Sequence, residues 1–230
     1  MIHDSRIRFL NDAAPRRGSY VLYWMQQSQR TRFNHALVYA VGEANSRGLP
    51  VVVGFGLTDD YPEANARHYA FMLDGLRDVA RELRDRRIRL VVRRGSPDEV
   101  ALKLSRGAAV VVCDRGYLRH QKAWRERVAR EARRRVVEVE TDVVAPVEVA
   151  SPTEELGART LRPRIDRVRD AFLRTVPEES VENTARSLKV KGDIDPLDPA
   201  GTLERLSIDR SIPPVRRFRG GSVEARRRLE

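Results

Sequence analysis

The chain has 230 residues, of which 41% are hydrophobic, so it is long enough for one well-packed core or for one domain with an appendage. No apolar run reaches the ~18 residues of a membrane helix, and the segment around Asp4 lacks the apolar stretch of a secretory signal. Cys113 is the only cysteine, which excludes an intrachain disulfide, and no His or Cys spacing typical of a metal site occurs. We therefore expect a cytoplasmic protein with no membrane and no metal partner.

The formal net charge of +11 favours a polyanionic partner, because basic side chains that contact phosphates release bound counterions. Many of the arginines, however, alternate with Asp and Glu on predicted helix faces. The run from Arg162 to Arg169 allows both interpretations, since it is either a solvated helix face or a surface that touches DNA. Charge alone leaves both alternatives open.

Residues 1–18 are expected to form a polar leader with a turn at Pro15 and Gly18. A strand over 19–25 follows, and then a helix over 32–47, whose apolar residues recur at helical spacing before Gly48 ends it. The next strand, 50–57, is apolar on both faces, which is typical of a parallel sheet covered on both sides.

Strands and helices continue to alternate through residue 140. We predict a helix that ends near 86, a strand over 88–92, a helix after Ser96, a strand over 109–113, a helix over 120–134 and a strand over 136–140. Ser96, Pro97 and Glu99 match a capping box with proline at the first helical position. This order predicts an α/β domain over 19–150 with a Rossmann-like, five-stranded parallel sheet and helices on both faces.

The alternation ends after this domain. Residues 151–217 are expected to be a partly helical interdomain linker, with one helix in which Leu161, Ile165, Val168 and Phe172 recur at helical spacing. Residues 218–230 are expected to begin a further, helical domain.

Three turns at predicted strand ends carry groups suited to binding a ligand. Because the carboxyl ends of parallel strands meet at one edge of a doubly wound sheet, these turns should form one crevice for a planar, partly polar ligand. The candidate binding residues are Trp24, Met25, Gln26, Arg30, Phe55, Leu57, Asp114, Gly116 and Tyr117. The alternative is that Trp24 and Phe55 only close the top of the core. No G-x-G-x-x-G motif follows the first strand, so the dinucleotide fingerprint is absent.

Several segments, in order along the chain, resemble the N-terminal half of class II cyclobutane pyrimidine dimer DNA photolyases. The resemblance is carried by Tyr20-Val-Leu-Tyr-Trp-Met-Gln26, Phe33-Asn-His-Ala-Leu-Val-Tyr-Ala40, Ala64-Asn-Ala-Arg-His-Tyr69, Asp114-Arg-Gly-Tyr-Leu-Arg119, Val139-Glu-Thr-Asp-Val-Val144, Thr160-Leu-Arg-Pro163 and Phe218-Arg-Gly-Gly221.

The resemblance implies a photolyase α/β domain that holds an optional antenna chromophore, a deazaflavin (8-HDF) or a folate, as part of light-dependent repair of UV-damaged DNA. In that family FAD lies in a following helical domain, which we expect this chain to lack, so no catalytic residue is assigned and the chain alone should not be catalytically competent. Whether it is a fragment or a stand-alone product is left open. The alternatives are a stand-alone Rossmann-like nucleotide- or flavin-binding or scaffold module, and an arginine-rich nucleic-acid-binding protein.

Overall fold

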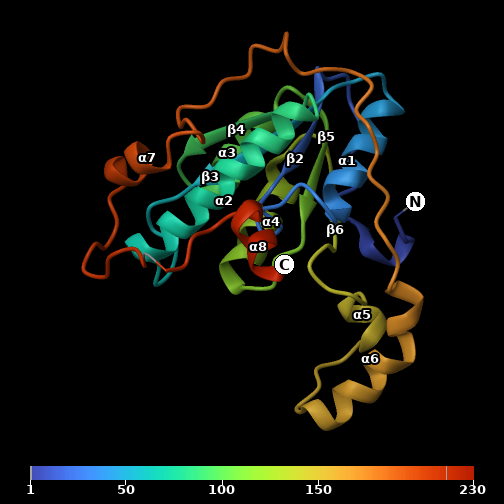
Figure 1. Cartoon of the computed structure of the whole chain (residues 1–230). Helices are drawn as coiled ribbons and strands as arrows, with labels where there is room; N and C mark the ends of the chain where they lie inside the picture. Colours follow the sequence, from blue (N-terminus) through green and yellow to red (C-terminus); the bar gives the residue numbers. More distant parts are fainter. Residues whose placement is uncertain (1, 216) are drawn as a thin grey trace.

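A computed structural model describes residues 2–215 and 217–230 of the chain. Its centre is a twisted sheet with the strand order β1-β6-β5-β2-β3-β4 (Figure 1). The strands are β1 (Ile7–Phe9), β2 (Tyr20–Trp24), β3 (Val51–Leu57), β4 (Arg89–Arg94), β5 (Ala108–Asp114) and β6 (Arg135–Val139). β2 through β6 pair in parallel, which confirms the predicted α/β class and the parallel core of the sheet.

The predicted strand count was one too low, because the segment expected as a polar leader supplies an edge strand. β1 pairs antiparallel with β6, with Ile7 opposite Val139 and Phe9 opposite Val137. The preceding Arg6, in the short 3-10 helix η1 (Asp4–Arg6), is buried and donates to the carbonyl oxygens of Glu140 (3.1 Å) and Val143 (3.0 Å). Three residues are too few to reveal a period of two, and the pairing depends on the open edge of β6.

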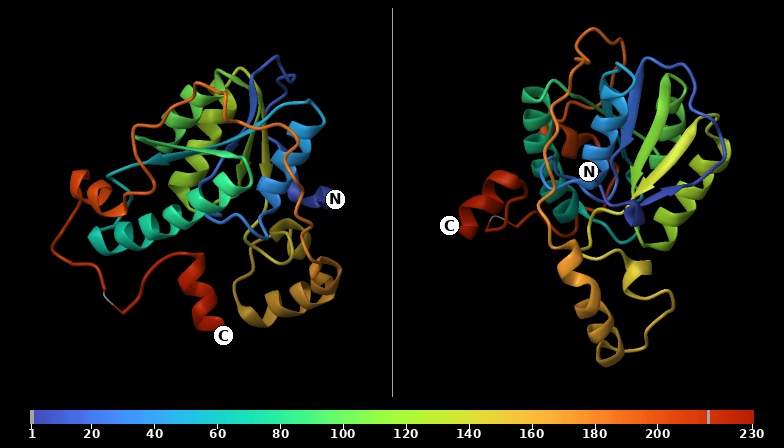
Figure 2. Two further views of the ribbon diagram at one scale, coloured as in Figure 1. Left: turned by 45° about the horizontal axis from the view of Figure 1, so that its top comes forward. Right: turned by 90° about the vertical axis from the view of Figure 1, so that its right-hand side faces the viewer.

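Helices cover both faces of the sheet, as predicted (Figure 2). Helices α1 (His35–Asn45) and α2 (Ala66–Asp85) pack on one face and form one core cluster with the odd-numbered residues of β2. Helices α3 (Pro97–Ser105) and α4 (Arg119–Glu131) lie on the other face, over Tyr20, Leu22 and Trp24. The alternation of side chains along β2 therefore divides them between two cores.

The predicted capping box at the start of α3 is wrong, although Pro97 does occupy its first turn. The Ser96 side chain caps no backbone N–H group, and its hydroxyl bonds the carboxylate of Asp98 instead. Asp98 also receives the Glu99 N–H (3.0 Å) and pairs with Arg127 of α4 (2.8 Å). The buried Asp98 thus takes the role predicted for Ser96 and ties α3 to α4.

The chain after β6 leaves the domain and then returns to it. Helices α5 (Val147–Ala150) and α6 (Ala158–Phe172) form a unit that projects from the body (Figure 1). The chain then passes along the open edge of β4, where Ile194 forms an antiparallel bridge with Val92. Helix α7 (Pro199–Arg205) packs on α2, and α8 (Ser222–Leu229) follows.

No helix among residues 2–215 and 217–230 is long and apolar enough to cross a membrane. The same residues contain no group of three or more His, Cys, Asp or Glu side chains arranged to hold a metal ion.

Candidate ligand cavity

A cavity of about 950 Å³ lies at the carboxyl ends of β2 and β3. Its walls come from the turn after β2, the end of β3 with the turn that follows, the inner face of α2, the first turns of α4, and α8. Its lining includes Gln26, Gln27, Arg30, Thr31, Phe55, Leu57, Tyr61, His68, Phe71, Met72, Glu82, Gln121, Trp124 and Ser222. Parallel strands place ligand sites at this edge of a sheet, so the position agrees with the topology.

The turn after β2 is held by one buried carboxylate. Asp114, the last residue of β5, accepts the backbone N–H groups of Gln26 (3.2 Å), Gln27 (3.1 Å) and Ser28 (2.9 Å). The hydroxyl of Tyr23 donates to the same carboxylate at 2.9 Å. Burial raises the pKa of Asp114 above its ordinary value, although these four donors favour the ionised form. Asp114 therefore shapes the cavity wall without facing the cavity.

One end of the cavity combines aromatic rings with amides. The Gln121 amide donates to Gln27 Oε1 at 2.8 Å and to the hydroxyl of Tyr61 at 3.4 Å. The rings of Tyr61 and Trp124 lie 6.3 Å apart, and His120 contacts both edge-to-face. Flat apolar faces with amide groups beside them suit a planar heteroaromatic ligand.

Another part of the cavity lining lies where α2 meets α8 and carries the carboxylate of Glu82. Glu82 of α2 accepts hydrogen bonds from the hydroxyls of Thr31 and Ser222, the latter at 2.9 Å, and pairs with Arg226 at 3.2 Å. Partial burial alone would raise the pKa of Glu82, but these donors outweigh it and hold the pKa below its ordinary value.

The structure brings together four of the nine predicted site residues. Gln26, Arg30, Phe55 and Leu57 line the cavity, although the Arg30 guanidinium is paired with Asp142 at 2.6 Å.

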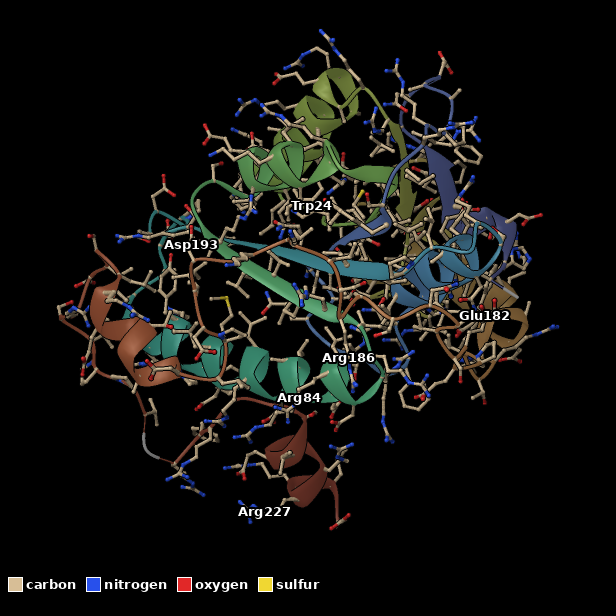
Figure 3. All side chains as sticks on the ribbon, turned by 90° about the horizontal axis from the view of Figure 1, so that it is seen from above. Trp24, Arg84, Glu182, Arg186, Asp193 and Arg227 are labelled. Carbon is tan, nitrogen blue, oxygen red and sulfur yellow. The ribbon has the colours of Figure 1, made fainter. Side chains whose placement is uncertain are left out.

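The other five predicted residues lie outside the lining for identifiable reasons. Trp24 is buried on the sheet face toward α3 and α4 (Figure 3), and Met25 is buried in the opposite core. Asp114 is turned toward the β2 turn, and Gly116 packs against the side chain of Gln121. Tyr117 donates to Glu140 at 2.6 Å, away from the cavity.

Sequence reasoning missed the contributions of α2, α4 and α8. Gln121 and Trp124 lie one turn apart on α4, and this spacing with Trp124 facing inward was the available signal. The contacts of α2 and α8 carried no such signal, because they depend on how the two helices cross.

A doubly wound α/β domain with a cavity at its strand ends is therefore the class that the geometry defines. The sequence model of the family described as DNA photolyase matches residues 21–182. A deoxyribodipyrimidine photo-lyase of Methanothermobacter thermautotrophicus is 46% identical over 90% of this chain and 50% of its own length. One of Potorous tridactylus is 33% identical over 84% of this chain and 36% of its own length. The chain belongs to the DNA photolyase family, and it spans half or less of the length of these relatives.

Two solved structures share this fold. An archaeal photolyase from Sulfolobus tokodaii, whose structure is described as having two FAD molecules and as implying a novel light-harvesting cofactor, has a TM-score of 0.65 and 17% identity. The match covers 91% of this chain and 46% of the Sulfolobus tokodaii chain. A Synechocystis cryptochrome has a TM-score of 0.69 and 14% identity, with 91% of this chain matched to 45% of it.

Proposed function

We propose that this chain is the chromophore-binding N-terminal part of a class II DNA photolyase, which repairs cyclobutane pyrimidine dimers in UV-damaged DNA with light. The cavity at the carboxyl ends of β2 and β3 carries this proposal, together with membership of the family. The ligand is an antenna chromophore, a deazaflavin such as 8-HDF or a folate. When bound, such a group absorbs light and passes its excitation energy to a flavin.

The residues that line the cavity fit such a ligand. Its volume of about 950 Å³ lies within the usual range for small-molecule sites, about 300–1,000 Å³. Phe55, Tyr61 and Trp124 offer faces for stacking, and the amides of Gln27 and Gln121 offer donors and acceptors at the ring edge. The heteroaromatic ring system would lie at this end, with its polar substituents toward Glu82.

The repair chemistry itself requires a flavin and a site for the damaged bases, in addition to the chromophore cavity. We propose that FAD is held by a helical domain in the remainder of the photolyase, and that this domain also receives the damaged bases flipped from the duplex. The match to about half of the Methanothermobacter photo-lyase supports this division of labour. The chain's own part is to bind and orient the chromophore.

A binding screen tests the proposal directly. The purified chain is titrated with 8-hydroxy-5-deazariboflavin, methenyltetrahydrofolate, FAD, ATP and AMP, and binding is measured by fluorescence and by the shift in melting temperature. We expect the deazaflavin or the folate to bind, and Gln121→Leu to weaken that binding by at least about fivefold through the loss of ring-edge hydrogen bonds. Glu126→Gln, an exposed substitution on the same helix, serves as the control.

The other ligands distinguish the alternatives. Stabilisation by ATP or AMP alone would contradict the antenna assignment and favour a nucleotide-binding module. FAD is included because the Sulfolobus tokodaii photolyase is described as having two FAD molecules. Binding of FAD alone in this cavity would keep the antenna role and change the chromophore.

A further inference from the structure

Helix α8 forms a wall of the cavity that is not held by a hydrophobic core. Gly221, Ser222 and Ala225 face the cavity, whereas no residue of α8, all of which the structure describes, is buried. Its apolar side chains Val223 and Leu229 are 61% and 88% exposed. Among the helices and strands, α8 packs on α2. Figure 3 shows α8 beyond α2, with Arg227 on its outer side.

The segment that leads into α8 crosses α2 at two consecutive glycines, Gly220 and Gly221. A Cβ atom at Gly220 would overlap the carbonyl oxygen of Phe71, and one at Gly221 would overlap the carboxylate of Asp78. Gly221 also has a φ of 109°, which side-chain-bearing residues rarely adopt. Two residues after Gly221, the N–H group of Val223 donates to Asp78 at 3.2 Å. The sequence is therefore adapted to bring the start of α8 directly onto α2.

Glu82 supplies the side-chain contacts that complete this docking. One carboxylate oxygen, Oε1, accepts the Ser222 hydroxyl at 2.9 Å and the Arg226 guanidinium at 3.2 Å. The other oxygen, Oε2, accepts the hydroxyl of Thr31 in the turn after β2. A single side chain thus joins three walls of the cavity: α2, the β2 turn and α8.

We propose that Glu82 is a positioning residue that latches α8 against α2, and that α8 is a detachable wall whose docking is coupled to occupancy of the cavity. The coupling rests on the proposed function, because it requires a ligand in the cavity. A ligand that contacts α8 makes all of its contacts only when α8 is docked. Its apparent affinity is therefore reduced when α8 is docked in only a fraction of the molecules. By reciprocity, the bound ligand holds α8 in place.

Hydrogen exchange of the backbone amides of α8 tests the latch without any ligand. In the intact chain, Glu82→Gln should speed exchange in residues 222–229 by at least about fivefold, because it removes the ionic contact with Arg226. Gly221→Ala should produce the same local change from the α8 side by blocking the close approach. Glu126→Gln removes an equal charge from an exposed position of α4 and should leave these amides unchanged.

Exchange in the core strands separates local release of α8 from general unfolding. Slow exchange in β3 and β5 should persist in both variants, because the amides of these buried strands exchange only when the core opens. If α8 exchanges at the same rate in the wild-type chain and in both variants, the latch is overturned.

Titration with 8-hydroxy-5-deazariboflavin tests the coupling. Binding should slow exchange in α8 of the wild-type chain. Glu82→Gln and Gly221→Ala should both weaken the affinity several-fold, and Gly221→Ala does so with the Glu82 carboxylate still in place. Unchanged affinity together with faster α8 exchange would overturn the coupling. If the wild-type chain binds no deazaflavin, folate or FAD, the proposed function fails and the coupling fails with it, while the ligand-free exchange still decides whether Glu82 holds α8.

Discussion

At the scale of single residues, buried polar groups decide the shape of the site. Asp114 satisfies three backbone N–H groups and the hydroxyl of Tyr23, and is itself only 1% exposed. Asp114→Asn would turn an amide N–H₂ group toward donors, which leaves buried groups unpaired. We expect the free energy of unfolding to fall by about 2–3 kcal/mol, measured by urea denaturation. Asp12→Asn, at an exposed position, is the control, and an equal effect of the two would contradict the role of Asp114.

His35 is a second single residue with a predicted effect, because it makes the stability of the folded chain depend on pH. Its Nδ1 is buried without a partner among the described residues, and burial, together with Arg6 and Arg30, lowers its pKa from 6.5 to about 4. As the pH falls from 6.5 to about 4, the imidazole of His35 takes up a proton in the unfolded chain but not in the folded chain. The free energy of unfolding therefore decreases as the pH falls through that window, and the contribution of His35 is fully present above pH 6.5. Allowing for partial exposure, we expect a loss of about 1 kcal/mol.

The measurement is the urea midpoint between pH 7 and pH 4 for the wild-type chain and for His35→Gln. The substituted chain should lose less stability over this window, because it has no imidazole to protonate. Parallel curves would show that other groups account for the whole dependence.

At the scale of elements, two glycines of β3 set the distance to α3. A Cβ atom at Gly56 would lie 2.6 Å from Pro97 Cα, which is backbone, whereas one at Gly54 would lie 2.6 Å from the tip of the Leu104 side chain. We expect Gly56→Ala to destabilise the protein by about 2–3 kcal/mol, and Gly54→Ala by less, because Leu104 can change rotamer. Thermal unfolding of the pair measures the difference, and a larger loss for Gly54→Ala would contradict it.

At the scale of the whole molecule, the arginines are as much structural as they are a charged surface. Arg89 donates to the carbonyls of Arg186 (3.1 Å), Leu188 (2.5 Å) and Val190 (3.1 Å), and so holds the returning chain against the edge strand β4. Figure 3 shows this segment between the labelled residues Arg186 and Asp193. Arg89 thus counts toward the net charge of +11 while its guanidinium is bonded within the molecule.

Arg89→Lys tests this role while preserving every trypsin site. Lysine keeps the charge but loses the forked donors, so the segment from residue 186 to 191 should be cleaved at least about fivefold faster. Arg67→Lys, on the exposed side of α2, is the control. Cleavage at equal rates, followed by mass spectrometry, would show that Arg89 does not hold this segment.

The structure places some of the predicted site residues in the cavity lining and others outside it. Phe55 and Leu57 were identified because an apolar strand end in a parallel sheet faces the ligand edge. Trp24 and Asp114 were also selected by residue type, yet both are turned into the interior, because side-chain direction at the end of a strand depends on the register of its neighbours. Glu82 lies in the middle of an amphipathic helix and had no local signal at all.

The sequence by itself determined the order of the strands and helices, the parallel core of the sheet and the family, because these follow from local periodicity and from segments whose residues are contiguous. The tertiary structure alone decided the antiparallel edge strand β1, the burial of Trp24, the cavity and its α8 wall. These features depend on contacts between residues far apart in the sequence, such as Arg6 with Glu140 and Glu82 with Ser222. Such contacts leave no periodic trace in the chain, since each arises only after the elements have packed.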